Sequence, residues 1–287
     1  EKTLALLSSE FARLGLKPGN NGSWFQDVPL VEITAKNVSP LRFSGGKTPV
    51  TAAYGPEMVI GTYRTAQPHI AVKDSPVVFV GYGINAPEKG WNDYAGVDVK
   101  GKTVIILVND PDYETSGLEG IFNGRAMTYY GRWTYKFEEA ARRGAIGALI
   151  VHDTPGAGYG WNVVKSPGGE NYDLVRPADR LTSLQLQGWI AGEAAKSLFA
   201  GAGQDLAALR KKARSSAFKP VELKGATFTA SFPVTQDVVQ SANVLARIPG
   251  AKRPDETIMY GAHWDAYGKG EPDAQGRIYR AGVRFNF

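Results

Sequence analysis

The chain has 287 residues, with 33 Lys and Arg against 28 Asp and Glu, and therefore a formal net charge of +5. Hydrophobic residues make up 43% and charged residues 21%, which indicates a folded globular chain and excludes intrinsic disorder. The absence of cysteine excludes disulfides, thiolate metal sites and a cysteine nucleophile. The apolar runs are far shorter than the roughly 18 residues that a membrane span needs, so we expect no membrane span. The basic residues are scattered, and we expect no nucleic-acid binding.

The first half of the chain alternates between helix-like and strand-like patterns. Apolar residues at helical spacing predict a helix over residues 1–16. Short alternating or continuous apolar runs then predict strands at 24–33, 57–63, 76–84, 103–108 and 144–151. A helix is predicted between the last two of these strands, at 132–143.

The second half begins with residues 155–180, which are rich in Gly, Pro, Asn and Asp and are expected to form a long ordered loop. Helical patterns follow at 184–200 and 205–215. Further strands are predicted at 227–235, 243–248 and 257–260. Together these patterns indicate an α/β domain interrupted by a β-rich insert.

Two glycine-rich stretches match phosphate-binding patterns by their letters. Residues 96–103 fit G-x-x-x-x-G-K-T, but the Lys-Thr pair runs directly into a strand, whereas a phosphate loop leads into a helix. Residues 81–86 fit the loose dinucleotide pattern, but Pro87 and Gly90 follow where that motif needs a helix. We therefore interpret both stretches as turns. The signatures G-x-S-x-G and H-E-x-x-H do not occur.

Of the three histidines, His263 stands in the most suggestive position. His69 follows Pro68 in a loop, and we expect it to be structural or exposed; His152 ends a strand, and we expect it to be structural. His263 comes just after the strand predicted at 257–260, where α/β sheets place functional groups. In an extended chain, residues two apart point to the same side, so His263 and Asp265 can face one site. The histidine could then bind zinc while the carboxylate orients it, although a hydrogen-bonded structural pair would give the same pattern.

Longer stretches resemble a known family, the di-zinc aminopeptidases, which include bacterial leucyl aminopeptidases and the glutamate carboxypeptidase group. Residues 241–250 and 256–268 resemble the entry to the catalytic domain, and 6–16 and 22–30 resemble its opening. Other stretches are similar to the protease-associated domain that such enzymes carry as an insert: 80–84, 91–94, 98–104 and 144–152. Residues 129–135 and 158–162 resemble the bacterial, secreted members.

This resemblance implies a fold and a domain organisation. The fold is α/β: a partial, mixed-sheet zinc-peptidase domain with three α/β/α layers, interrupted by a β-rich protease-associated domain. The peptidase domain would begin in residues 1–39, the insert would span 40–225, and the peptidase domain would continue in 226–287. Periplasmic or secreted localisation is implied by the family alone.

The resemblance also implies an activity, release of N-terminal residues from peptide substrates with two zinc ions as cofactors. His263 would be a zinc ligand and Asp265 the catalytic carboxylate that orients the site. After residues 279–282, however, the family pattern calls for an Asp that bridges both metals, and this sequence has Val283 to Phe287 instead. Two protein groups cannot hold two zinc ions. We therefore expect an N-terminal portion of an aminopeptidase with an incomplete metal site, inactive by itself.

A second interpretation is a non-catalytic protease-associated module that binds peptides or partner domains. The aromatic, glycine-rich stretch 158–161 is the predicted source of its contacts. This interpretation predicts neither bound zinc nor hydrolysis.

Overall fold

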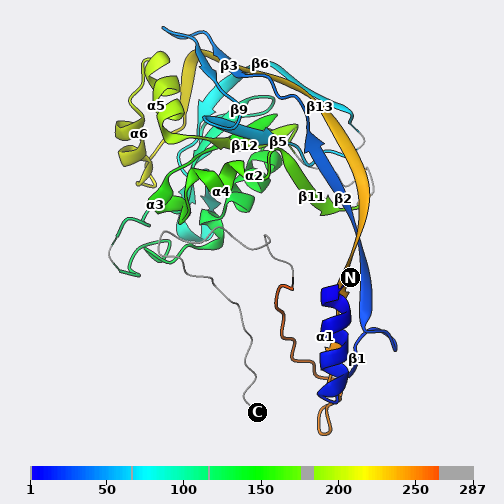
Figure 1. Cartoon of the computed structure of the whole chain (residues 1–287). Helices are drawn as coiled ribbons and strands as arrows, with labels where there is room; N and C mark the ends of the chain where they lie inside the picture. Colours follow the sequence, from blue (N-terminus) through cyan, green and yellow to red (C-terminus); the bar gives the residue numbers. More distant parts are fainter. Residues whose placement is uncertain (1, 66, 116, 176–183, 265–287) are drawn as a thin grey trace, which may run out of the picture. The chain divides into compact units, whose positions relative to one another are not determined.

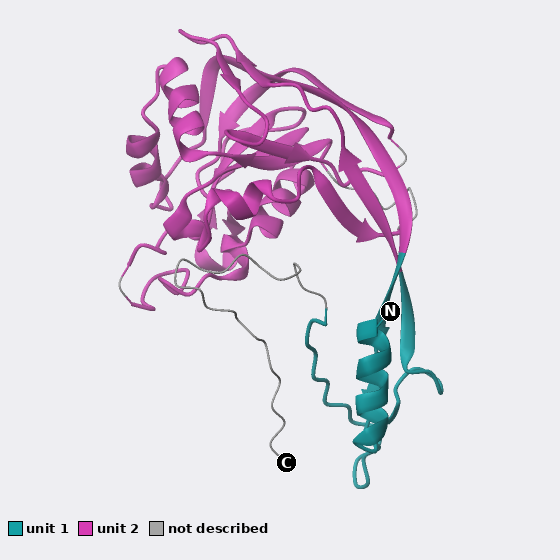
Figure 2. Cartoon of the chain, in the orientation of Figure 1, with its two compact units in different colours: residues 1–28, 240–287 teal, residues 29–239 magenta. Residues whose placement is uncertain are grey.

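Residues 2–65, 67–115, 117–175 and 184–264 are described by a computed structural model of the chain. By internal contacts the chain divides into unit 1, residues 1–28 and 240–287, and unit 2, residues 29–239 (Figure 2). Unit 2 extends beyond the insert expected at 40–225 on both sides. Strand β13 (Val221–Val244) runs across the expected end at 225, and β2 (Phe25–Ala35), which lies before the expected start at 40, pairs with β13 in the same sheet.

The main element of the fold is a mixed sheet, which has ten strands within the described residues (Figure 1). Eight of them follow in the spatial order β11-β2-β13-β6-β9-β10-β12-β5, and β3 and β4 extend from β13. The strands besides β2 and β13 are β3 (Leu41–Ser44), β4 (Val50–Ala52), β5 (Met58–Gly61), β6 (His69–Phe79), β9 (Thr103–Leu107), β10 (Gly147–Val151), β11 (Glu170–Leu174) and β12 (Leu186–Ile190). A separate small ladder pairs β7 (Asn85–Ala86) with β8 (Trp91–Asn92).

The centre of this sheet is parallel. Strand β9 pairs in parallel with β6 on one side and with β10 on the other, and β10 pairs in parallel with β12. Every residue of β9 and β10 is buried, as expected for parallel strands that are covered on both faces. The strands predicted from apolar runs at 103–108 and 144–151 are thus confirmed, and both form the middle of the core.

Helices cover both faces of the sheet. Neighbouring side chains of β9 enter different clusters: Ile105 lies in the cluster that contains Phe199, and Ile106 in the one that contains Phe137. Phe199 belongs to α5 (Gly192–Gly201), and Phe137 to α2 (Trp133–Arg142). Unit 2 is therefore layered helix, sheet, helix, and the expected α/β class with a mixed sheet is confirmed. The remaining helices of unit 2 are α3 (Thr154–Ala157), α4 (Trp161–Lys165) and α6 (Leu206–Ala213), with 3-10 turns at Pro87–Lys89 and Tyr129–Gly131.

Two expectations for this region are wrong. Residues 155–180 are not one long loop, because α3, α4 and β11 occupy much of this stretch. The helix expected at 184–200 begins only at Gly192, because residues 186–190 form strand β12. Tertiary pairing decides the second case: β12 joins β10 from Gly147↔Leu186 to Val151↔Ile190 and leaves the buried strand without an open edge.

The two phosphate-like stretches are turns, as predicted. Lys102 is followed directly by β9, so residues 96–103 lead into a strand and not into a helix. Residues 81–86 lead into a 3-10 turn of three residues rather than into the helix of a dinucleotide site. No helix in the described part of the chain is long and apolar enough to span a membrane.

Unit 1 joins the two ends of the described chain. It contains helix α1 (Lys2–Arg13), which confirms the predicted N-terminal helix, and a two-stranded ladder of β1 (Lys17–Pro18) and β14 (Ala246–Arg247). The ring of Phe11 on α1 lies 6.3 Å from the ring of Trp24. None of the described residues of unit 1 is buried, so its described part, residues 2–28 and 240–264, forms no closed core by itself.

Candidate functional site

The predicted metal ligand His263 lies in unit 1, in a segment that forms no regular structure. The strand expected at 257–260 is wrong: these residues pair with no strand of the described chain, and Ile258, Met259 and Tyr260 are each more than 80% exposed. A strand needs a neighbour for its backbone hydrogen bonds, and the described residues offer none here. Asp265 lies outside the described residues. The expectation that the side chains of His263 and Asp265 face one site therefore remains a prediction.

Hydrogen bonds nevertheless connect the segment that leads to His263 with other parts of unit 1. Gly19 donates its N–H to the carbonyl of Leu245 at 2.9 Å, and Leu245 donates back to the carbonyl of Trp24 at 2.8 Å. The indole of Trp264, next to His263, donates to the carbonyl of Ala242 at 3.0 Å. Segments more than 200 positions apart in the sequence are thus brought together.

The described residues do not by themselves form a metal centre. No group of three or more His, Cys, Asp or Glu side chains able to hold a metal ion occurs among them. A zinc ion needs about four ligands, so His263 would have to be joined by groups outside the described part of the chain.

A polar cluster stands where the parallel strands end, the edge at which α/β folds place ligands. Asp153 follows β10 and accepts bonds from the Tyr113 hydroxyl at 2.6 Å and from Arg210 Nη2 at 2.8 Å. Arg210 also bonds to the Tyr113 hydroxyl and lies 3.3 Å from Glu114, which pairs with Arg214. Burial raises the pKa of Asp153, but the bonds from Arg210 and Tyr113 outweigh it and hold the pKa below its ordinary value. The acids and bases of this cluster form ion pairs with one another, although the buried Nε of Arg210 has no hydrogen-bond partner among the described residues. These pairs connect α6 to the sheet.

A second cluster at the same edge is buried completely and was missed by the sequence analysis. Lys136 of α2 donates to the carbonyl of Tyr82 at 2.6 Å and to that of Asn109 at 2.9 Å. Burial lowers the pKa of Lys136, and the negative carboxylates of Asp110 and Asp93 oppose this by favouring its charged form. Lys136 and Asp110 are 0% exposed and Asp93 is 1% exposed. A sequence signal existed, because Lys136 lies between the apolar Tyr135 and Phe137 on a helix that faces the core.

His152 is structural, as expected, and His69 is exposed, but it is the first residue of β6 rather than part of a loop. The His152 ring is buried and lies 5.5 Å from the ring of Trp161 and 6.1 Å from that of Trp189, and its Nε2 is 3.0 Å from the carbonyl of Tyr159. The aromatic residues predicted to supply binding contacts at 158–161 are thus largely engaged by the protein itself. Trp161 also donates to the carbonyl of Gly55 at 2.9 Å.

His69 Nε2 and the Ser231 hydroxyl share a hydrogen bond of 2.8 Å on the solvent side of β6 and β13. A serine and a histidine at this distance resemble part of a nucleophilic site. The nearby pocket of about 280 Å³, however, is lined by Gln67, Pro68, Val234 and Gln236. Val234 is buried whereas Ser231, three residues earlier in the same strand, is exposed, so the two point to opposite faces of the sheet.

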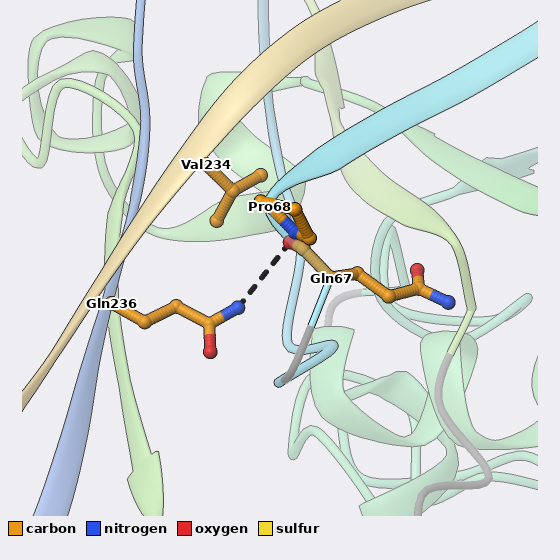
Figure 3. A pocket seen from close by; sticks show the side chains of 4 residues that line it. All are labelled: Gln67, Pro68, Val234 and Gln236. Carbon is orange, nitrogen blue, oxygen red and sulfur yellow. Dashed lines mark hydrogen bonds between the residues drawn. The ribbon is translucent and has the colours of Figure 1, made fainter.

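The pocket itself carries no titratable side chain. Gln236 Nε2 donates to the backbone carbonyl of Gln67 at 3.4 Å across its mouth (Figure 3). It also donates to the carbonyl of Arg64 at 3.2 Å. The pocket therefore supplies hydrogen bonds and an apolar wall but no acid, base or nucleophile.

Of the comparisons with known proteins, the one with solved structures found matches. No protein-family model and no curated protein sequence matches the chain. Among solved structures, the chain is similar to an aminopeptidase from Aneurinibacillus sp. strain AM-1, with 16% sequence identity and a TM-score of 0.38. The match covers 88% of this chain and 43% of that protein, so the chain spans less than half of its length. A similarity at this level does not place the chain in a family.

Proposed function

We propose that these 287 residues belong to a zinc-dependent aminopeptidase, a hydrolase that releases N-terminal residues from peptides outside the cytoplasm. They would contribute a protease-associated insert together with the beginning of the peptidase domain. The proposal rests on the sequence resemblance around His263 and in the insert. It is supported by one structural observation, the return of the chain to its own start after a large separate unit. Such a return is what an insertion into a second domain requires.

In this proposal His263 binds one zinc ion and Asp265 orients that histidine. A carboxylate that accepts the second ring N–H of a histidine selects the tautomer and increases the basicity of the ligating nitrogen. Because the described residues lack the other ligands, the proposal requires them from polypeptide outside these residues. No catalytic step can be assigned to the residues of unit 2.

The test uses the longest natural polypeptide that contains this sequence, beginning with its intact mass, which is 30.9 kDa for these residues alone. We expect a heavier protein that holds about two zinc ions and releases amino acids from aminoacyl 4-nitroanilides in a chelator-sensitive manner. His263→Ala is expected to lose one zinc ion and nearly all activity. His69→Ala is the matched control, because His69 is an exposed histidine in the other unit. A heavier, zinc-loaded protein that cleaves no aminoacyl substrate would refute the proposal.

The alternative is a non-catalytic module that binds peptides or partner domains, and one observation favours it. The loop between β9 and α2, together with the first residue of α2, exposes five large apolar side chains in a short stretch of unit 2. They are Leu118, Ile121, Met127, Tyr129 and Trp133. Exposed apolar groups gathered in this way are typical of contact surfaces. A protein of 30.9 kDa without zinc and without hydrolysis would favour this alternative.

A further inference from the structure

The buried cluster of Lys136, Asp93 and Asp110 has no role in either candidate function. It connects three segments that are distant in sequence. Lys136 reaches from α2 to the turn after β6 through Tyr82, and to the turn after β9 through Asn109. One side chain thus fastens the carboxyl ends of two parallel strands to the helix that covers them.

The two aspartates extend this fastening to the neighbouring loops. Asp93 accepts bonds from the backbone N–H of Ile84 at 3.0 Å and from the indole N–H of Trp91 at 2.8 Å. Asp110 accepts from the backbone N–H of Thr128 at 2.7 Å and from its hydroxyl at 3.0 Å. Asp110 therefore holds the end of the loop that exposes the apolar side chains between β9 and α2.

The charges of the cluster do not balance. One ammonium and two carboxylates give a net charge of −1 when all are ionised, in a place where none of the three is more than 1% exposed. An uncompensated buried charge is costly, and a protein usually avoids it by binding or releasing a proton. Other ionisable groups face the cluster. Glu139 pairs with Arg142 and Arg143, whereas Asp112, which accepts from the N–H of Phe122, adds a further negative charge near Asp110. The buried Tyr94 interacts with the charge of Asp93 and lies under the guanidinium of Arg143.

We propose that Lys136, Asp93 and Asp110 form a proton-linked latch, in which binding of one proton by the buried cluster tightens the loops at 80–94 and 108–131 and its release loosens them. Asp93 is the group that takes up the proton. Its carboxylate is 1% exposed and accepts from the backbone N–H of Ile84 and the indole N–H of Trp91, with the backbone N–H of Tyr82 as a further donor.

The direction of the effect follows from the pKa values. Burial raises the pKa of Asp93 to about 7, from an ordinary value of 3.8. A group whose pKa is raised in the folded state stabilises it below the unfolded value, and this stabilisation is lost as the pH rises through the folded pKa. Burial also lowers the pKa of Lys136, to about 8, and this acts in the opposite direction above that pH.

The net effect can be expressed as a change in the opening of the loops. As the pH rises through the folded pKa of Asp93, loss of its proton increases the opening constant, and the lowered pKa of Lys136 acts against this increase at higher pH. We therefore expect amide hydrogen exchange of the two loops, corrected for its intrinsic pH dependence, to accelerate between pH 6 and pH 8. Helix α5, which lies outside the cluster, serves as the internal reference.

The decisive measurement follows the proton in the wild-type chain and needs no variant. The Trp91 indole N–H donates to Asp93, so its NMR resonance is expected to titrate with a midpoint within about one unit of pH 7. Trp161 donates to the neutral carbonyl of Gly55 and is the control, with a resonance that stays constant. A Trp91 resonance that is flat from pH 5 to pH 9 would overturn the proposal.

Variants then test the coupling within the cluster. Lys136→Met removes the positive charge at nearly constant side-chain length, so the pKa of Asp93 should increase and the Trp91 midpoint should move to higher pH. Lys196→Met on α5 removes an exposed lysine that pairs with Glu193, and is expected to leave the midpoint unchanged. An identical midpoint in wild type and Lys136→Met would also contradict the latch. If Lys136→Met does not fold, the titration of Trp91 in the wild-type protein decides alone.

Discussion

Removal of the Asp153 carboxylate is expected to be among the most destabilising changes at the edge of the sheet. Asp153→Ala removes three bonds, from the Tyr113 hydroxyl at 2.6 Å, from Arg210 at 2.8 Å and from the N–H of Gly156 at 3.1 Å. A hydrogen bond to a charged group contributes about 1.5–3 kcal/mol, and a helix N-cap about 1 kcal/mol. Because Asp153 and Arg210 are each about one quarter exposed and the bonds share one carboxylate, we expect a combined loss of about 2–4 kcal/mol.

The free energy of unfolding is measured by urea denaturation at pH 7, followed by far-UV circular dichroism. The matched control is Glu193→Ala, which removes a pair of similar length, 2.6 Å to Lys196, on an exposed helix surface. That change is expected to cost less than about 0.5 kcal/mol. If Asp153→Ala costs no more than Glu193→Ala, the bonds around Asp153 do not stabilise the fold and the reasoning is wrong.

The same variant has a characteristic pH dependence. Because the pKa of Asp153 is below its ordinary value of 3.8 in the folded protein, its contribution is present above that pH and is lost as the pH falls through the lowered pKa. The difference between wild type and Asp153→Ala is therefore expected to shrink in acid. A difference that is constant from pH 7 to pH 3 would contradict the assigned role of the charge.

Two further predictions concern the packing of unit 2. Phe79→Ala is expected to cost about 3–5 kcal/mol in the same urea assay, because the Phe79 ring is fully buried against the rings of Phe199 and Phe218. Its control, Met259→Ala at a highly exposed site, should cost less than about 0.5 kcal/mol. Equal costs would refute this assignment of the core. Gly188→Ala is expected to cost about 1–3 kcal/mol, since its Cβ would collide with the carbonyl of Val59 on the paired strand β5; unchanged stability would show that the two strands are not packed this closely.

Local sequence patterns identified the elements whose apolar residues form an uninterrupted run or a clear helical stripe. Strands β9 and β10 and helices α1 and α2 were predictable in this way, because burial on both faces needs a continuous apolar strand and burial on one face needs a 3.6-residue period. Local reasoning failed at 186–190 and 257–260. The first stretch is a strand because β10 and β5 pair with it, and the second is not a strand because no described strand does.

The functional residues divide in a similar way. The sequence alone selected His263 and Asp265, through their spacing and through a family resemblance, and no group of three or more possible metal ligands occurs among the described residues. It did not select Lys136, Asp93 or Asp110, which lie on different segments and carry no motif of their own. Only the tertiary structure brings these three side chains together in the core. Because they are removed from water there, the protonation state of each affects the stability of the fold.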